Sequence, residues 1–309
     1  MFPKDEPDVS LALKFATSNK ISLSIKCGGH NPSGASSITD GLCIDLSRYF
    51  NTARVDPEKR LVYVGGGATW KTVDHATIAH GLATPGGTVN QTGVGGLILA
   101  GGYGFLSGQY GLVIDNLVQA TVVTADGSVV TASPTSHSDL FWGIRGGGCN
   151  FGIVTEFVLK VYPQRKTVFA GQVIFPPPLL GKVCEAVDKW WPEAKEQEAM
   201  MLALTRGPDR QVRIDDQLLS WCELISFQPI IAVVLFYNGS EEEGRANFKQ
   251  FYEIGMSVFN SHLIWIPLMQ ALGPVADFTR ELPYEHLNSI LDQDDKPKKK
   301  KYMACHSDI

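Results

Sequence analysis

Glycine is concentrated in one part of this sequence, and its distribution constrains the fold more than any other feature. Twenty of the 31 glycines lie between Gly65 and Gly152. Three clusters follow predicted strands: Gly28-Gly29, Gly86-Gly87 and the block Gly93–Gly104. Because glycine has no Cβ, its backbone N–H can approach a ligand or another chain segment closely. Two interpretations are open, close packing in a β-rich domain or a site around the phosphates of a dinucleotide, and the number of clusters favours the dinucleotide.

The common nucleotide fingerprints do not occur in the sequence. The G-x-G-x-x-G pattern has no match, and its best alignments fail at Ile98, Ser107 and Phe151. The segment Gly65–Thr72 fails the P-loop pattern because tryptophan stands where glycine must precede the lysine. The residues alone therefore predict a phosphorylated cofactor that is bound through backbone amides.

His30 follows two glycines directly at the end of the predicted strand 21–26. Its ring is therefore expected beside whatever this loop binds. The alternative is a histidine that hydrogen-bonds a loop carbonyl. His75 and His80 fall on the polar side of a predicted helix, and we expect them to be solvated.

The hydrophobic pattern predicts an α+β chain that changes character at Pro163. Before this proline it predicts strands over 21–26, 42–47, 61–64 and 153–161, a hairpin over 117–132 that turns at Asp126-Gly127, and helices over 9–16, 70–81 and 139–142. After it come predicted strands over 168–175, 200–205 and 229–237 and helices over 180–196 and from Ser240. We therefore expect one domain over 1–164 and a second over 165–309.

The last predicted helix has a clear beginning. Ser240 and Glu243 have capping-box spacing. One face carries aromatic residues and a glycine is expected to end the helix: Phe248, Phe251, Tyr252 and Gly255. The lysine-rich stretch 296–301 is predicted to be a solvated tail.

Composition excludes several classes of protein. A net charge of −5 gives no reason to expect nucleic acid or an anionic membrane as partner. No apolar run reaches the roughly twenty residues of a membrane helix, and the first ten residues lack a signal-peptide pattern. The six cysteines have no metal-ligand spacing, so no metal site is predicted. As written, the chain is expected in the cytoplasm, or outside the cell if a signal sequence preceded it.

The string Lys26-Cys-Gly-Gly-His-Asn-Pro-Ser-Gly34 resembles the flavin loop of FAD-linked oxidases of the berberine-bridge-enzyme type. These belong to the wider vanillyl-alcohol-oxidase class, whose flavin module is called PCMH. Further matching segments follow in the family's order over about 150 residues: Gly65–Trp70, Gly93–Gly96, Gly101–Gly104, Tyr110–Leu112, Asp115-Asn116, Asp139–Gly148 and Asn150–Val154. The resemblance implies a PCMH-type FAD-binding domain of two α+β subdomains, followed by a partial substrate domain with an antiparallel sheet and helices.

The resemblance also implies how FAD is held. The family's histidine after the paired glycines bonds the 8-methyl carbon of the flavin, and His30 matches it. Some members add a cysteinyl bond from four residues before Gly-Val-Gly-Gly, where this sequence has Val89, so a single covalent link is expected. Cys27 and Cys43 are read as small buried residues, and Arg145 as structural. The implied cofactor-binding residues are Lys26, Cys27, Gly28, Gly29, His30, Asn31, Gly93, Gly95, Gly96, Gly101, Gly102, Gly104, Gly152 and Val154.

The implied activity is hydride transfer from an alcohol, sugar or alkaloid-like small molecule to the flavin N5, with oxygen as the expected acceptor. The family has one more strand before the first helix, and it continues beyond position 309 with a Tyr-Tyr-Gly-x-Asn-type element. The sequence names no catalytic base. One alternative is therefore a truncated flavin-binding fragment without turnover. Another is a binding module that uses the glycine loops for a different phosphate ligand.

Overall fold

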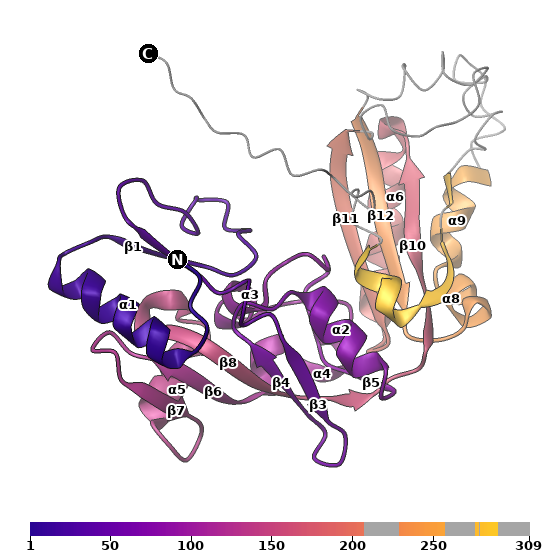
Figure 1. Ribbon diagram of the computed structural model, residues 1–309. Helices are drawn as coiled ribbons and strands as arrows, with labels where there is room; N and C mark the ends of the chain where they lie inside the picture. The colour runs from indigo at the N-terminus through magenta and orange to yellow at the C-terminus, as the bar shows by residue number, and fades with distance from the viewer. Residues whose placement is uncertain (207–228, 257–275, 278, 290–309) are drawn as a thin grey trace, which may run out of the picture.

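A computed structural model describes residues 1–206, 229–256, 276–277 and 279–289 of the chain. It shows an α+β protein with two large β-sheets (Figure 1). The lysine-rich stretch 296–301 lies outside these residues. Within them, no helix combines the length and apolar character that a membrane span needs.

The first sheet has five antiparallel strands in the order β3-β4-β8-β6-β7. Their bounds are β3 (Ala53–Asp56), β4 (Leu61–Gly65), β6 (Leu117–Val123), β7 (Val129–Ala132) and β8 (Ile153–Lys160). Valine, isoleucine and phenylalanine predominate because they pack well on a pleated surface. The central strand β8 is buried along almost its whole length. This sheet is the platform that carries the glycine-rich loops.

Short elements lie on this platform: α2 (Trp70–Ile78), α3 (Val94–Leu99), α4 (Ser107–Tyr110) and α5 (Ser138–Ile144), with β5 (Leu82–Ala83) paired to β9 (Tyr162–Pro163). Trp70 of α2 and Ile98 of α3 are fully buried in one core with Val64 and Phe157 of the sheet. The apolar core therefore packs α2 and α3 together with the sheet.

The N-terminal residues form a small unit that packs against Val123 and Ile153 of the first sheet. Helix α1 (Glu6–Ser18) begins at Asp5, whose carboxylate accepts a hydrogen bond from the Asp8 N–H. Strands β1 (Leu23–Lys26) and β2 (Leu42–Asp45) pair in parallel. On the other side of β2, the Met1 ammonium donates to the Cys43 carbonyl at 2.6 Å, and the Asp45 N–H donates to the Met1 carbonyl at 2.9 Å. The loop 27–41, which contains His30, thus connects two parallel strands.

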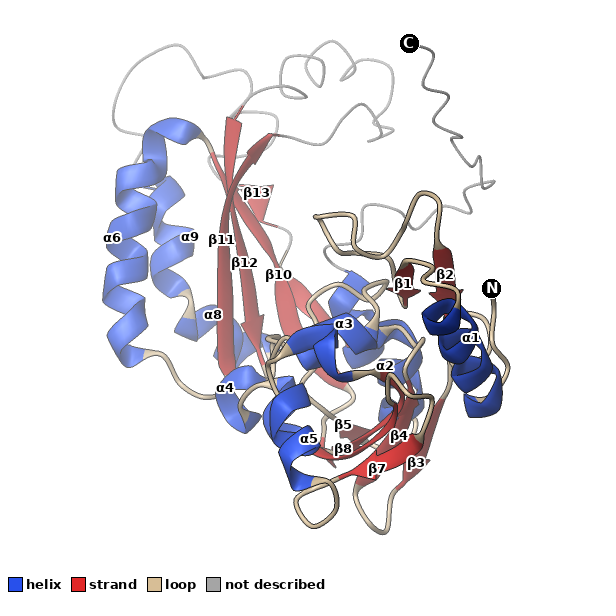
Figure 2. Ribbon diagram, turned by 90° about the vertical axis from the view of Figure 1, so that its left-hand side faces the viewer, coloured by secondary structure: helices blue, strands red, loops and turns tan. Residues whose placement is uncertain are grey.

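The second sheet is antiparallel, with the order β11-β12-β10-β13, and β14 pairs with another part of β10. The strands are β10 (Thr167–Phe175), β11 (Glu198–Arg206), β12 (Pro229–Tyr237), β13 (Ala276–Asp277) and β14 (Arg280–Pro283). Helices α6 (Leu180–Trp190), α8 (Glu241–Asn247) and α9 (Lys249–Met256) lie on one side of it (Figure 2). Phe248 and Phe251 are fully buried there against Phe169 and Val233.

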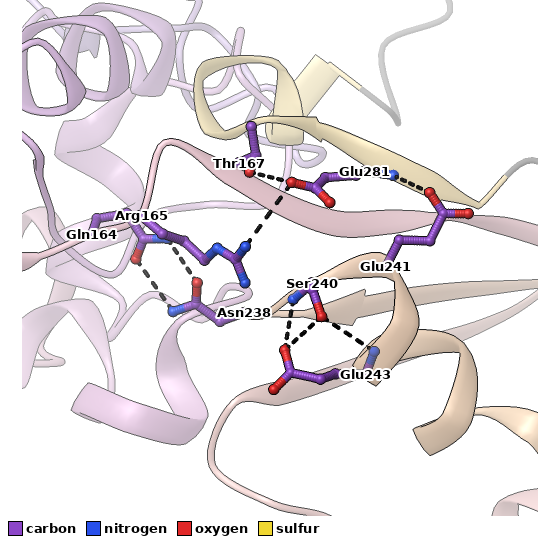
Figure 3. A network of polar contacts seen from close by, with 8 residues as sticks. All are labelled: Gln164, Arg165, Thr167, Asn238, Ser240, Glu241, Glu243 and Glu281. Carbon is purple, nitrogen blue, oxygen red and sulfur yellow. Dashed lines mark hydrogen bonds and ion pairs between the residues drawn. The ribbon is translucent and has the colours of Figure 1, made fainter.

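The two parts meet through a mixed apolar and amide contact. Phe105 and Leu106 pack with buried residues of the second sheet. The Asn238 amide nitrogen donates to Gln109 at 2.7 Å, and Gln164 donates to the Asn238 oxygen at 2.8 Å. Figure 3 shows Asn238 facing Gln164 at the end of β12. Since Gln109 lies in α4, this contact ties the glycine block that precedes α4 to the second sheet.

Most predicted elements are confirmed, including the hairpin at Asp126-Gly127 and the capping box at Ser240. Two predictions are wrong, and several short elements, among them β3 and α3, were not predicted. The helix predicted to reach Glu196 ends at Trp190, where a short 3-10 turn with Pro192 follows. The helix after Ser240 is two helices that break at Phe248, and Gly255 lies inside the second. Strand β3 was not predicted, because its four residues, Ala53–Asp56, include only two apolar side chains.

Candidate functional site

His30 lies in the exposed loop that leaves the carboxyl end of β1. The preceding Gly29 has φ of +73°, a left-handed conformation that glycine adopts without strain. No hydrogen bond to the His30 ring occurs among the described residues. In the described part of the chain, His30 therefore does not hydrogen-bond a loop carbonyl, as the alternative interpretation required. His75 and His80 are exposed, as expected.

The His30 loop lies directly against the turn that begins α3. A Cβ on Gly28 would lie 2.4 Å from the Gly93 nitrogen, and one on Gly93 would lie 2.3 Å from the Gly28 nitrogen. Gly93 is the N-cap of α3, and the next N–H, from Val94, donates to the Ala68 carbonyl at 2.9 Å. Only two glycines allow the backbones to come so close. The structure thus brings together the loops around His30 and Gly93.

Cys27 fills the space between these two loops. Its thiol donates to the Ala68 carbonyl at 3.2 Å. Burial raises the pKa of the Cys27 thiol, although the backbone N–H groups of Gly95, Gly28 and Val94 lower it in part. The thiol is therefore protonated at neutral pH and acts as a packing group. The prediction that Cys27 and Cys43 are buried is wrong, because both are only partly buried. They lie at the base of the exposed loop 27–41 rather than in the core.

Lys26 forms an ion pair with Asp45 at the same end of the β1–β2 pair. The Nζ–Oδ2 distance is 2.6 Å, and the side chains are 39% and 11% exposed. The other carboxylate oxygen accepts hydrogen bonds from the N–H and hydroxyl of Ser47. Partial burial raises the pKa of Asp45, but the hydrogen bonds from Lys26 and Ser47 outweigh it and keep the pKa below its ordinary value. Asp45 is therefore ionised at neutral pH.

Gly152 and Val154 lie on the far side of the same cluster. Gly152 has φ of +142°, and Val154 is buried in β8. A Cβ on Gly66 would lie 2.0 Å from the Val154 carbonyl oxygen, and the Gly66 carbonyl oxygen is 3.0 Å from a Cβ placed on Gly95. Close approaches thus connect β8 with Gly66, and Gly66 with Gly95 of α3. The Cys27 Cβ lies 3.8 Å from the same Gly95 Cβ position.

The block Gly101–Gly104 is tied to α3 in another way. A Cβ on Gly102 would lie 2.6 Å from the Leu97 side chain, and one on Gly104 would lie 1.7 Å from the Gly86 carbonyl oxygen. At these positions the missing Cβ serves close packing within the protein. At Gly96, by contrast, a Cβ would meet nothing within 4 Å, and the residue is exposed. The close-packing interpretation therefore applies to Gly102 and Gly104 and not to Gly96.

The remaining predicted residues have local roles in the structure. The Asn31 carboxamide oxygen accepts from the N–H and hydroxyl of Ser33, which orders the loop just after His30. Val89 is half-buried, and its carbonyl accepts from the Thr92 N–H at 3.1 Å. Arg145 pairs with Asp115 at 3.5 Å and lies over the Phe141 ring. Within the described ranges, no group of three His, Cys, Asp or Glu side chains could hold a metal.

The sequence did not indicate Asp45 as part of this cluster, and Gly66 and Ala68 entered only as members of the matching segment Gly65–Trp70. Asp45 is nineteen positions from Lys26, and only the parallel register of β1 and β2 makes them neighbours. The signal that could have found it is a pair of opposite charges in two consecutive predicted strands, Lys26 in 21–26 and Asp45 in 42–47.

Residues 1–133 match the FAD binding domain family. The FAD-linked oxidoreductase pgmH of Aspergillus terreus is 38% identical over 256 residues, which is 82% of this chain and 49% of the relative. The (R)-6-hydroxynicotine oxidase of Paenarthrobacter nicotinovorans is 36% identical over 170 residues, 55% of this chain and 37% of the relative. This chain thus spans about half the length of the curated relatives that have the longer matches.

Solved structures agree with the sequence relatives. The crystal structure of 6-hydroxy-D-nicotine oxidase from Arthrobacter nicotinovorans superposes with a TM-score of 0.72 at 25% identity, over 93% of this chain and 56% of that one. A xylooligosaccharide oxidase from Myceliophthora thermophila shares the fold, with a TM-score of 0.70 at 24% identity over 96% and 56% of the two chains. The chain is therefore a relative of the FAD-linked oxidoreductases, and its N-terminal residues form their PCMH-type FAD-binding domain.

Proposed function

We propose that this chain belongs to an FAD-dependent oxidase in which His30 alone holds the flavin covalently. The observation that carries the proposal is the direct contact of Gly28 with Gly93, which sets the exposed His30 beside the turn at the start of α3. Glycine-rich turns present backbone N–H groups that suit a pyrophosphate. The open space at Gly96 fits the same assignment.

Different residues of this chain would contact different parts of FAD. Gly93, Gly95 and Gly96, with Gly101, Gly102 and Gly104, would border the phosphates and ribityl chain. Gly28, Gly29 and Asn31 would hold the flavin end with His30, and Gly152 and Val154 the adenine end. Bound FAD supplies the hydride acceptor. We keep 1–164 as the FAD-binding domain and 165–309 as the substrate domain, because the two large sheets take their strands from opposite sides of Gln164.

Attachment would join a ring nitrogen of His30 to the flavin 8-methyl carbon. The methyl group gives up one hydrogen and the imidazole its N–H proton. The attachment would thus be a two-electron oxidation, in which oxygen would carry off the two hydrogens and two electrons as hydrogen peroxide. A neutral imidazole is required for this bond. The relative from Acremonium strictum is described as holding a 6-S-cysteinyl, 8α-N1-histidyl FAD. Val89, at the position of the family's cysteine, supports a single link here.

The substrate class is proposed from the relatives and not from this site. Their names describe oxidases of a hydroxylated nicotine, of chitooligosaccharide and of xylooligosaccharide. A small alcohol, sugar or alkaloid-like molecule is therefore the proposed hydride donor, with oxygen as acceptor. No catalytic base is assigned.

The test is the fate of flavin in purified protein. Acid-precipitated wild type should keep flavin fluorescence in a denaturing gel, His30→Ala should lose it, and the exposed control His75→Ala should keep it. Covalent flavin in His30→Ala, or well-folded wild type without flavin, would overturn the proposal. Oxygen consumption with a panel of alcohols and sugars then separates an oxidase from the alternative of flavin binding without turnover.

A further inference from the structure

We propose that the ion pair between Lys26 and Asp45 is a positioning device that holds the His30 loop in the geometry needed for flavin attachment. This inference rests on the proposed covalent link at His30. It assigns a role to Asp45, which no motif in the sequence indicated.

The pair closes the end of the strands from which the loop emerges. Lys26 and Asp45 are the last residues of β1 and β2, and they are direct partners in the parallel register. Their side chains meet at 2.6 Å, and the backbone continues the contact because the Leu46 N–H donates to the Lys26 carbonyl at 2.9 Å. Both oxygens of Asp45 are engaged, one by Lys26 and one by Ser47. The carboxylate is thus fixed from two sides.

The lysine side chain reaches under the loop itself. A Cβ placed on Gly29 would lie 3.4 Å from the Lys26 Cε, so the end of the lysine stem lies close to the residue just before His30. Gly28, which precedes Gly29, lies directly against Gly93. The chain is therefore held on two sides immediately before His30, by the Lys26 stem and by the start of α3.

The segment 29–35 around His30 has only local support, and the loop next meets a strand at Ser36, whose carbonyl accepts from the Cys43 thiol of β2 at 3.8 Å. Residues 29–35 are exposed. Within the described ranges, every hydrogen bond of this segment has its partner between Asn31 and Ser37. These bonds shape the turn but do not anchor it to the sheets. The position of His30 therefore depends on the contacts that precede it. Among these contacts, the Lys26–Asp45 ion pair can be removed while the glycine contacts stay intact.

Two roles for Lys26 make different predictions. If its ammonium acts directly on the flavin, Asp45→Asn leaves that charge in place and attachment continues. If the pair positions the loop, Asp45→Asn and Lys26→Gln both slow attachment, and Lys26→Arg restores it because the guanidinium keeps the charge and reaches a carboxylate. Reacting groups lose up to ~100-fold in rate when displaced by about 1 Å. We expect the two neutral variants to attach flavin about tenfold more slowly, corresponding to about 1.4 kcal/mol in the barrier.

The experiment follows covalent attachment in time. Full-length apoprotein is mixed with excess FAD, samples are acid-precipitated, and gel fluorescence gives the attached fraction. Equilibrium FAD affinity is measured in the same variants carrying His30→Ala, which prevents attachment. In Asp45→Asn, which keeps the Lys26 ammonium, a positioning role predicts a slower attachment rate with FAD affinity changed less than about threefold. Asp56→Asn is the matched control, since Asp56 also pairs with a lysine, Lys59, at 3.2 Å but at the end of β3.

The possible results separate the two proposals. Wild type that never attaches flavin overturns the proposed function and this inference with it. Wild-type attachment with an equal rate in Asp45→Asn overturns this inference alone, and so does equal slowing in Asp56→Asn. Should Asp45→Asn fail to fold, Ser47→Ala decides, because it removes the hydroxyl bond to Asp45 and leaves the Lys26 charge in place: the inference requires slower attachment in this variant, and a wild-type rate overturns it.

Discussion

Replacement of Gly28 by alanine should force apart the His30 loop and the turn at Gly93. The new Cβ would lie 2.4 Å from the Gly93 nitrogen and 2.8 Å from its Cα, whereas ordinary contact begins at 3.4 Å. Both neighbouring atoms belong to the backbone, so the loops must separate by about 1 Å. Overpacking of this kind costs roughly 1–3 kcal/mol of unfolding free energy. A displacement of about 1 Å at His30 should slow flavin attachment by up to ~100-fold.

Urea unfolding and the attachment assay measure the two effects separately. Gly181→Ala is the control, because a Cβ at Gly181, in α6, would meet nothing within 4 Å. This variant should attach flavin like wild type and be as stable or slightly more stable, since alanine favours helix. Gly28→Ala with wild-type stability and wild-type attachment would refute the conclusion that this contact positions His30.

Four further outcomes are expected. Gly96→Ala should be as stable as wild type or more stable by up to ~1 kcal/mol, since the Cβ meets no atom and alanine favours helix, but titration should show weaker FAD binding. Asn238→Ala should lower the unfolding free energy by about 1–3 kcal/mol in urea, because two partner amides lose their hydrogen bonds. Trp190→Phe should cost about 1–3 kcal/mol by the same measurement, because it removes the 2.7 Å bond to the buried Glu198 carboxylate. Hydrogen bonds from Thr124 and Ser128 lower the pKa of Asp126 to about 2. The ionised carboxylate therefore stabilises the fold fully above pH 3.8, and this contribution falls as the pH drops toward 2. Acid titrations of unfolding free energy should lack this fall in Asp126→Asn.

Local chemistry explains which elements could be predicted from the sequence. The capping box at Ser240 is reciprocal in the structure, with the Glu243 carboxylate accepting from the Ser240 N–H at 2.9 Å. The Asp126 carboxylate likewise accepts from the Ser128 N–H and orders the predicted hairpin turn. Such features depend on residues within three positions of one another, so the sequence contains all the information that they need.

The failures came from contacts between distant segments. The helix after Ser240 breaks at Phe248, which is buried together with Trp190 and Phe251, and apolar spacing alone does not show such a break. The Lys26–Asp45 pair depends on the register of β1 with β2. The glycines of the candidate site looked alike in the sequence, yet Gly104 packs on protein backbone while Gly96 faces open space. Only the fold separates these two uses of glycine.

The central claim is that His30 is the single covalent anchor of FAD, and the mass of one peptide tests it most directly. Trypsin cleavage after Lys26 and Arg48 releases residues 27–48, which contain His30 and no other histidine. The account predicts that this peptide from acid-precipitated protein carries the mass of FAD less two hydrogen atoms, with fragment ions that place it on His30. An unmodified peptide from flavin-containing protein, or flavin on another peptide, would contradict the account.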